Sequence, residues 1–191
     1  MVVLPTGYIT EMIINQSFLK TPICLFDAKT GILCSKCDAK LTSGQLNAAA
    51  VYSSIKLAKL GEKDQEISKF TLVGSHKVDD DYILFLRTSD IITIRSNPSI
   101  IKKFAGEFNA NIWFVEAEGT DRRFMENLFY PLRILSMNLI WLPDGNKLTR
   151  VILSQESANK TSFPLDVEKI RKVAKVVKKI DLIVEFETQS N

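Results

Sequence analysis

The sequence predicts an α+β protein, and three local patterns lead to that prediction. β-rich runs and amphipathic helical runs alternate along the chain instead of forming separate blocks. The strands 132–142 and 147–154 flank the turn PDGN (143–146), whose Pro, Asp and Gly favour a hairpin. Residues 164–179 have apolar side chains on one helical arc and cations on the opposite arc. A length of 191 residues suits one ordinary domain with an appendage, or two small domains.

The remaining elements follow from periodicity, propensity and turn signals. Residues 1–23 are an apolar strand or ordered arm, and 181–187 are a last strand. We predict a helix at 43–60, which Gly61 ends, and then a polar linker at 61–69. A hairpin of strands 69–78 and 82–87 follows, with a strand at 90–94 and a helix whose inward residues are Ile100, Ile101, Phe104 and Phe108. A strand at 111–116 then precedes a helix from Thr120 to about Tyr130, which Pro131 stops. Trp113, Trp141 and Tyr130 could stack on bases, but Trp113 and Trp141 lie in strands, which favours the core.

Composition excludes several classes of function. No stretch approaches eighteen apolar residues, so no membrane span is expected, and the N-terminus lacks a secretory signal, which points to the cytoplasm. Neither a phosphate loop nor an H-E-x-x-H motif is present, and His76 is the single histidine. We therefore expect no enzyme and no small-molecule substrate.

The net charge of +3 conceals a basic segment. Residues 122–179 carry twelve Lys or Arg and five Asp or Glu, a local net charge of +7. Such a segment can contact phosphates, although a merely solvated face explains the charge equally well. The cations that could form a phosphate-binding surface are Arg171, Lys172, Lys175, Lys178 and Lys179 on the last helix, with Arg122, Arg123, Arg133 and Arg150.

All three cysteines lie in one short segment that has the spacing of a zinc knuckle. The pattern is Cys24-x2-Asp27-x6-Cys34-x2-Cys37, with Asp27 where a fourth cysteine would stand. A pair of ligands separated by two residues can reach one ion from a single tight turn, and Gly31 permits the reversal between the two pairs. Three interpretations stay open. The first is a structural zinc held by the three cysteines and by either Asp27 or an outside fourth ligand such as His76. The second is a knuckle that folds without metal, and the third is a redox dithiol at Cys34 and Cys37.

The stretch IRSNPSIIKKFAGEFNANIWFVE (94–116) resembles a KH domain, in which Ile-Gly-x-x-Gly is followed by a helix and a strand. The segment 122–145, with its WLPDG turn, is similar to the end of the first KH domain of NusA. Together with the cysteines, residues 20–187 resemble the small archaeal NusA-like KH proteins. The resemblance implies a prokaryotic, type II KH core, and a helix at 88–94 in place of the strand that propensity favours; we take the helix.

The same resemblance implies a domain organisation. Residues 1–66 hold the zinc-knuckle-like segment and a helix, and residues 67–191 hold a degenerate KH-like RNA-binding region with a second KH-like half, ending in a hairpin, helix and strand extension. No internal repeat is convincing in the sequence alone.

The Gly-x-x-Gly positions fall on Arg95, Ser96, Asn97 and Pro98, so both glycines are missing. This loop lets the KH backbone approach phosphates, and without glycine that approach is impaired. Arg95, Ser96, Asn97, Lys102 and Lys103 could still contact RNA, or the core could be purely structural.

These observations lead to a non-enzymatic, NusA-like protein that binds single-stranded RNA and acts in transcription elongation or termination. The alternative is a protein–protein interaction module that docks on RNA polymerase or the ribosome and has lost nucleic-acid binding.

Overall fold

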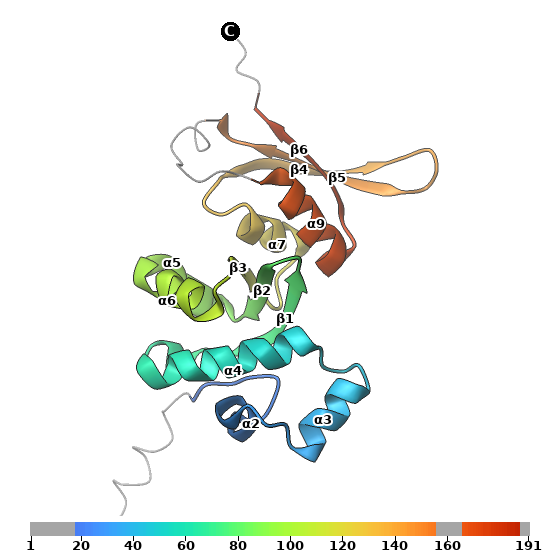
Figure 1. Cartoon of the computed structure of the whole chain (residues 1–191). Coiled ribbons are helices and arrows are strands. Elements are labelled where there is room, and N and C mark those ends of the chain that lie inside the picture. Colours follow the sequence, from blue (N-terminus) through green and yellow to red (C-terminus); the bar gives the residue numbers. More distant parts are fainter. Residues whose placement is uncertain (1–17, 156–165, 188–191) are drawn as a thin grey trace, which may run out of the picture.

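Two small sheets of the same design organise the chain, and the α+β prediction is confirmed (Figure 1). The computed structural model describes residues 18–155 and 166–187. The predicted beginning of an arm before residue 18 and the predicted helix start at Pro164 lie outside those residues. Among the described residues, no helix is long and apolar enough to cross a membrane.

The N-terminal part is helical. It contains α2 (Leu25–Thr30), α3 (Ser35–Thr42) and α4 (Ala48–Lys63). The Asn47 Oδ1 accepts a hydrogen bond from the Ala50 N–H at 2.7 Å and caps α4, while its Nδ2 donates to the Ser75 carbonyl at 2.9 Å. One side chain therefore begins the helix and fastens it to the following sheet.

The predicted bounds of this helix were wrong at both ends. Ser43 belongs to the end of α3, and α4 continues past Gly61 to Lys63. A Cβ at Gly61 would lie 3.3 Å from the Ser68 Cα, so this glycine allows the next segment to approach closely instead of ending the helix. The expected polar linker is folded, because it contains the 3₁₀ turn Ile67–Lys69 and the fully buried Ile67.

The first sheet has the order β1-β2-β3. Its elements are β1 (Leu72–Val78), β2 (Asp81–Leu86), α5 (Thr88–Ser96), α6 (Pro98–Phe108) and β3 (Ile112–Glu116). β1 and β2 form the predicted antiparallel hairpin, and β3 is parallel to β2. α5 confirms the helix that we expected at 88–94 in place of the strand that propensity favours there. On α6, Ile100, Phe104 and Phe108 are buried as predicted, but Ile101 is exposed.

The second sheet repeats this topology. Its elements are α7 (Asp121–Leu128), β4 (Ile134–Trp141), β5 (Lys147–Leu153), α9 (Val167–Lys178) and β6 (Asp181–Phe186). Here too an antiparallel hairpin is followed by a strand parallel to the hairpin's second strand. The hairpin, the Thr120 cap, which accepts from the Arg123 N–H, and the final strand are all confirmed.

Hydrophobic core residues pack on both faces of the first sheet. Leu84 and Leu86 pack with apolar residues of α4, α5 and α6. Ile83 and Val115 point the other way and join a cluster formed by α7, α9 and the second sheet. The two sheets are thus joined through a layer that contains α7 and α9, as Figure 1 shows.

Trp141 is not in the core, contrary to expectation. Its side chain is 62% exposed near the end of the β4–β5 hairpin, which projects beyond the helices (Figure 1). The Lys147 ammonium lies 4.2 Å from the centroid of its ring and covers part of it.

Candidate metal centre and nucleic-acid interface

The cysteine segment brings four ligand atoms together. Cys24 and Cys34 are the N-caps of α2 and α3, and Asp27 and Cys37 are the third residues of those helices. Cap and third residue lie on the same side of a helix start, so two short helices present two ligands each. One sulfur or oxygen from each of the four residues lies within 4.8 Å of the others, and the group could hold a metal ion.

Hydrogen bonds already orient these ligands. The Cys24 N–H donates to the Cys37 sulfur at 3.4 Å, and the Asp27 N–H donates to the Cys24 sulfur at 3.5 Å. The Asp27 Oδ2 accepts from the Cys34 N–H at 3.0 Å, but its buried Oδ1 has no hydrogen-bond partner among the described residues. A metal ion bound among the three thiols could coordinate this buried carboxylate oxygen and so satisfy it.

The same contacts shift the titration of the cluster. Hydrogen bonds from the Cys34 backbone N–H and the Cys37 thiol hold the pKa of Asp27 well below its usual range, despite burial. The Cys24 backbone N–H lowers the pKa of Cys37, but the Asp27 carboxylate and burial outweigh it and raise that pKa to about 12. The pKa of Cys24 is also raised: the Asp27 N–H lowers it, but the Asp27 carboxylate and burial act more strongly together.

His76 is not part of this cluster. It lies on β1 with its ring edge against Phe85, at 5.7 Å between centroids. Burial and, to a lesser extent, the nearby Lys179 lower its pKa. Both effects favour the neutral imidazole, so His76 is a packed strand residue at neutral pH.

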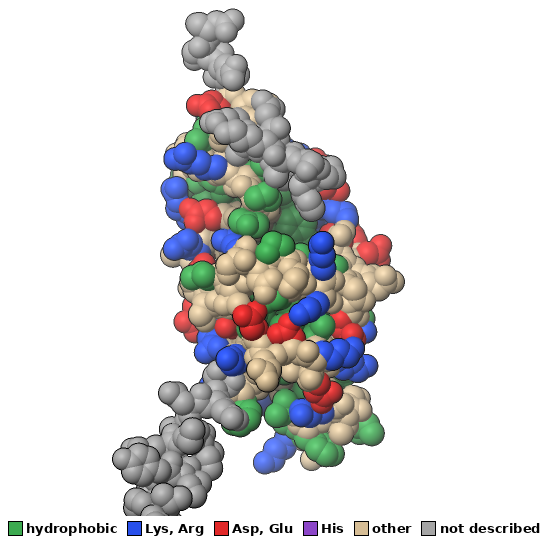
Figure 2. All heavy atoms as spheres, turned by 90° about the vertical axis from the view of Figure 1, so that its left-hand side faces the viewer, with side chains coloured by type: hydrophobic (Ala, Val, Ile, Leu, Met, Phe, Trp, Pro, Cys, Tyr) green, Lys and Arg blue, Asp and Glu red, His purple; other side chains and the backbone are tan. Residues whose placement is uncertain are grey.

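The second feature is a groove between the two sheet units, with a volume of about 850 Å³. α6 contributes Ile101 and Ala105 to its wall, and β3 contributes Ile112, Trp113 and Phe114. Figure 2 shows hydrophobic side chains gathered between the two units on this face of the molecule. The groove is therefore largely apolar.

Polar side chains lie at defined places around the groove. At one of them, the Arg95 guanidinium lies 4.3 Å from the centroid of the Tyr130 ring and donates to the Asn127 Oδ1. At another, the buried Asp81 accepts from the Trp113 Nε1 at 3.2 Å and pairs with Lys169 at 3.4 Å.

The loop at the Gly-x-x-Gly positions has used most of its own polar groups. Ser96 Oγ donates to backbone carbonyls of α5. The Asn97 Oδ1 accepts from Ser99, and its Nδ2 donates to Glu66. Pro98 has no N–H, so Arg95 is the group of this loop that faces the groove.

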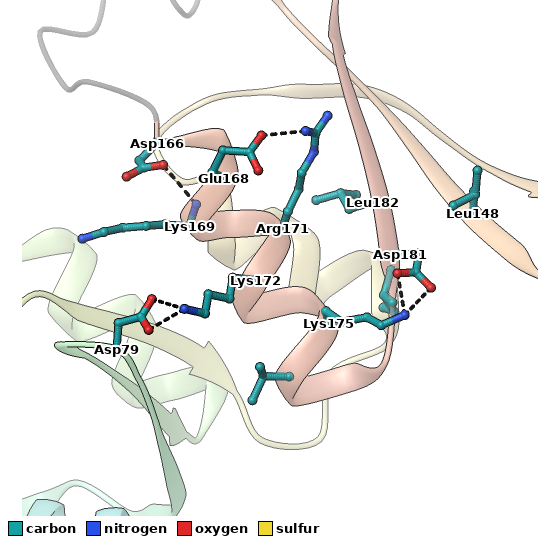
Figure 3. Close-up of a pocket in the computed structure, with 12 residues that line it drawn as sticks. Asp79, Leu148, Asp166, Glu168, Lys169, Arg171, Lys172, Lys175, Asp181 and Leu182 are labelled. Carbon is teal, nitrogen blue, oxygen red and sulfur yellow. Dashed lines mark hydrogen bonds and ion pairs between the residues drawn. The ribbon is translucent and has the colours of Figure 1, made fainter.

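Four basic side chains of α9 are partly exposed but lie beside carboxylates, and Figure 3 shows three of these pairs. The predicted helical arcs are right, because Ile170, Val173 and Ala174 are buried. The cations on the other arc pair as follows: Arg171 with Glu168, Lys172 with Asp79, Lys175 with Asp181, and Lys178 with Asp121. Two of these carboxylates, Asp79 and Asp121, are distant in sequence, and the charge of the helix alone therefore overstated the positive field at its surface.

The other predicted cations are dispersed. Arg122 and Arg123 both contact Glu126, Arg150 pairs with Glu185, and Lys103 pairs with Asp64 at 2.6 Å. Lys102 and Arg133 are exposed on α6 and just before β4. On the face shown in Figure 2, basic and acidic side chains alternate. The chosen cations therefore do not form one continuous basic surface there.

Two groove residues were not identified from the sequence. Asn127 and Lys169 lie on predicted helices, but only for Asn127 does the sequence contain a pattern that could have indicated its position. It stands three residues after Phe124 and beside Leu128, so it is a polar residue on the inward face of α7.

Comparison with known proteins adds little to this description. No protein-family model matches the chain, and no curated protein matches it. Among solved structures, the crystal structure of APE1850 aligns with a TM-score of 0.44 at 15% sequence identity, over 69% of this chain and 95% of that chain. A likeness of this size carries no argument about function.

Proposed function

We propose that the protein binds single-stranded RNA in the groove between its two sheet units, without catalysing a reaction, as a relative of the NusA-like KH proteins. The order α5, short loop, α6, β3 agrees with the helix, strand and loop positions that the KH resemblance predicts. The observation that carries the proposal is the apolar wall of the groove, with the cation Arg95 beside it. Lys169 also lines the groove, next to the acidic Asp81, Asp166 and Glu168.

The chemistry of the groove fits single-stranded nucleic acid. Apolar and aromatic walls suit the faces of unpaired bases, and a cation at the edge suits the backbone that joins them. Arg95 takes the part that the loop backbone has in the KH family, since neither glycine is present. A role in transcription elongation or termination is part of the same proposal.

The groove offers apolar and aromatic walls for bases, which the basic arc of α9 does not. Each of four α9 cations lies beside a carboxylate that repels phosphate. These pairs are exposed and individually weak, so RNA can compete for the cations, but the net attraction is small. We assign α9 an accessory electrostatic contribution.

We also propose that zinc occupies the cluster of Cys24, Asp27, Cys34 and Cys37. Zinc favours thiolates and tetrahedral sites, and a Zn–S bond of about 2.3 Å places neighbouring sulfurs about 3.8 Å apart. Atoms within 4.8 Å of one another need only a small contraction to reach that spacing. The metal would fix α2 against α3 and satisfy the Asp27 Oδ1. Metal analysis of protein purified without chelator tests this, with one zinc per chain expected.

The test of the groove is a substitution that fills it. Ala105 is exposed on α6 and lines the groove, so Ala105→Trp should block it without disturbing the core. Ala39→Trp, at an exposed position on α3, is the matched control. Fluorescence anisotropy with a labelled twelve-nucleotide oligouridylate measures binding at several salt concentrations.

We expect Ala105→Trp to weaken binding by at least about fivefold, because each stacked base contributes about 1–3 kcal/mol. Ala39→Trp should bind like the unmodified protein. Equal affinity of both variants would place the RNA elsewhere. Absence of binding at low salt, for the unmodified protein, would defeat the proposed function.

A second candidate function rests on a different surface. Phe26 and Ile32, in and just after α2, are 70% and 72% exposed beside the metal cluster. Exposed apolar side chains on a segment that the proposed zinc would hold rigid suit docking on a protein partner such as RNA polymerase or the ribosome. Phe26→Ser with Ile32→Ser should then abolish co-sedimentation with the purified partner and leave RNA affinity unchanged.

A further inference from the structure

Asn127 has a buried amide with only half of its hydrogen bonding satisfied. The residue is 7% exposed, and it lines the groove from α7. Its Oδ1 accepts from the Arg95 guanidinium, while its Nδ2 has no hydrogen-bond partner among the described residues. Buried donors without partners are rare in proteins, so this amide needs an explanation.

The orientation of the amide follows from chemistry. A guanidinium group has only donors, so the atom of Asn127 that faces Arg95 must be the oxygen. The Tyr130 ring, whose centroid is 4.3 Å from the guanidinium, holds Arg95 in place. The NH₂ group of Asn127 is therefore fixed on the other side, buried and without a hydrogen-bond partner among the described residues.

The pair consequently offers several donors, and one of the two lone pairs of its single acceptor, the Asn127 Oδ1, is already used. Asparagine usually reads adenine by donating to N7 and accepting from the exocyclic amine, but here the accepting oxygen already binds Arg95. Uracil carries two carbonyl groups, and guanine presents O6 beside N7, so both match a pair of donors. The apolar walls around Asn127 disfavour a phosphate at this depth, because burial of a charge without full pairing is costly.

We propose that Asn127 and Arg95 form a subsite that reads the carbonyl edge of a keto base, uracil or guanine, in the groove and disfavours adenine. This inference rests on the proposed RNA-binding function. The Nδ2 atom is closed to water in the free protein, so a rim side chain must turn aside when the base enters. Arg95 is half-buried, so the other N–H groups of its guanidinium can contact the base or the RNA backbone while Nη2 keeps its hydrogen bond to Asn127.

The experiment compares oligouridylate and oligoadenylate of twelve nucleotides. We expect the unmodified protein to prefer oligouridylate by about tenfold, which is within the discrimination of a good base-edge contact. Asn127→Asp keeps the shape and the acceptor for Arg95 but removes the donor. Because oligoadenylate stacks on itself, the quantity compared is the ratio of the two affinities in each protein.

Asn138→Asp, on the exposed face of β4, introduces the same change outside the groove and serves as control. A ratio reduced in Asn127→Asp and unchanged in Asn138→Asp supports the subsite. An unchanged ratio in Asn127→Asp overturns it, while RNA binding as such still stands. If Asn127→Asp does not fold, Asn127→Leu is measured in the same way. Failure of the unmodified protein to bind either oligonucleotide defeats the proposed function and the subsite together.

Discussion

Asp81 and Asp79 lie two residues apart in the β1–β2 hairpin, and we predict very different consequences when each is replaced by alanine. Both carboxylates contact a lysine of α9, so both link the two sheet units. Asp81 is 3% exposed and also accepts hydrogen bonds from Trp113 and Asn111. Asp79 is exposed, and within residues 18–155 and 166–187 its side chain pairs with Lys172 only. Comparing the two substitutions therefore separates the contribution of a buried hydrogen-bond network to the free energy of unfolding from the contribution of a surface ion pair.

The expected cost of Asp81→Ala follows from its three partners. A hydrogen bond to a charged group contributes about 1.5–3 kcal/mol, and this value applies to the half-buried Trp113 indole. The Asn111 amide is exposed and can turn to water, so it adds little. The pair with Lys169, whose side chain is 41% exposed, adds about 0–1 kcal/mol. The sum is about 1.5–4 kcal/mol, against about 0–1 kcal/mol for Asp79→Ala.

Urea unfolding followed by tryptophan fluorescence measures both free energies of unfolding. Trp113 loses its hydrogen-bond partner in Asp81→Ala, so its native emission should change as well, and it should not change in Asp79→Ala. An equal m-value in all three proteins is required for the comparison. If the two variants differed by less than about 0.5 kcal/mol, the buried network would not join the two units in the way that we describe.

Three further predictions concern the metal, a cap and a packing contact. Because the pKa values of Cys24 and Cys37 are raised, both thiols are protonated at neutral pH, and zinc binding through their thiolates releases one proton from each. The zinc association constant should therefore rise with pH, by at least about a hundredfold per pH unit near neutrality, in a competitive chelator titration; a flat profile would contradict this. Thr120→Ala removes the cap of α7 and should lower the free energy of unfolding by about 1 kcal/mol in urea, where no change would refute the cap. Gly61→Leu should cost about 1–3 kcal/mol in the same assay because its Cβ meets the Ser68 backbone, and a neutral result would show that this contact yields.

Local chemistry made most of the elements predictable. The PDGN turn, the Thr120 cap and the arcs of α9 depend on residues within a few positions of one another, and the structure agrees with all three. The bounds of α4 failed because Gly61 serves a contact with Ser68 and not a helix end. Trp141 was misplaced because its surroundings depend on how far the hairpin extends beyond the helices, which no local pattern records.

The cysteine cluster and the basic helix show the same distinction within the candidate sites. Cys24, Asp27, Cys34 and Cys37 occupy cap and third positions of two short helices, so their spacing alone predicted that they converge. The α9 cations were also found by spacing, but their partners Asp79, Asp121 and Asp181 come from other elements. A basic stripe in a sequence therefore measures charge on one helix and not the field at the surface.

The groove could not be found from either half of the chain because it belongs to their junction. The two units share the topology of hairpin, helix and parallel strand, and the groove is lined by residues of both. Arg95 from the first unit orients Asn127 from the second, and Lys169 from the second unit pairs with Asp81 from the first. Binding at this junction would hold the two units in one arrangement. If RNA binds there, the free energy of unfolding should rise with RNA concentration as mass action requires, and Asp81→Ala should weaken RNA binding although Asp81 is buried away from solvent.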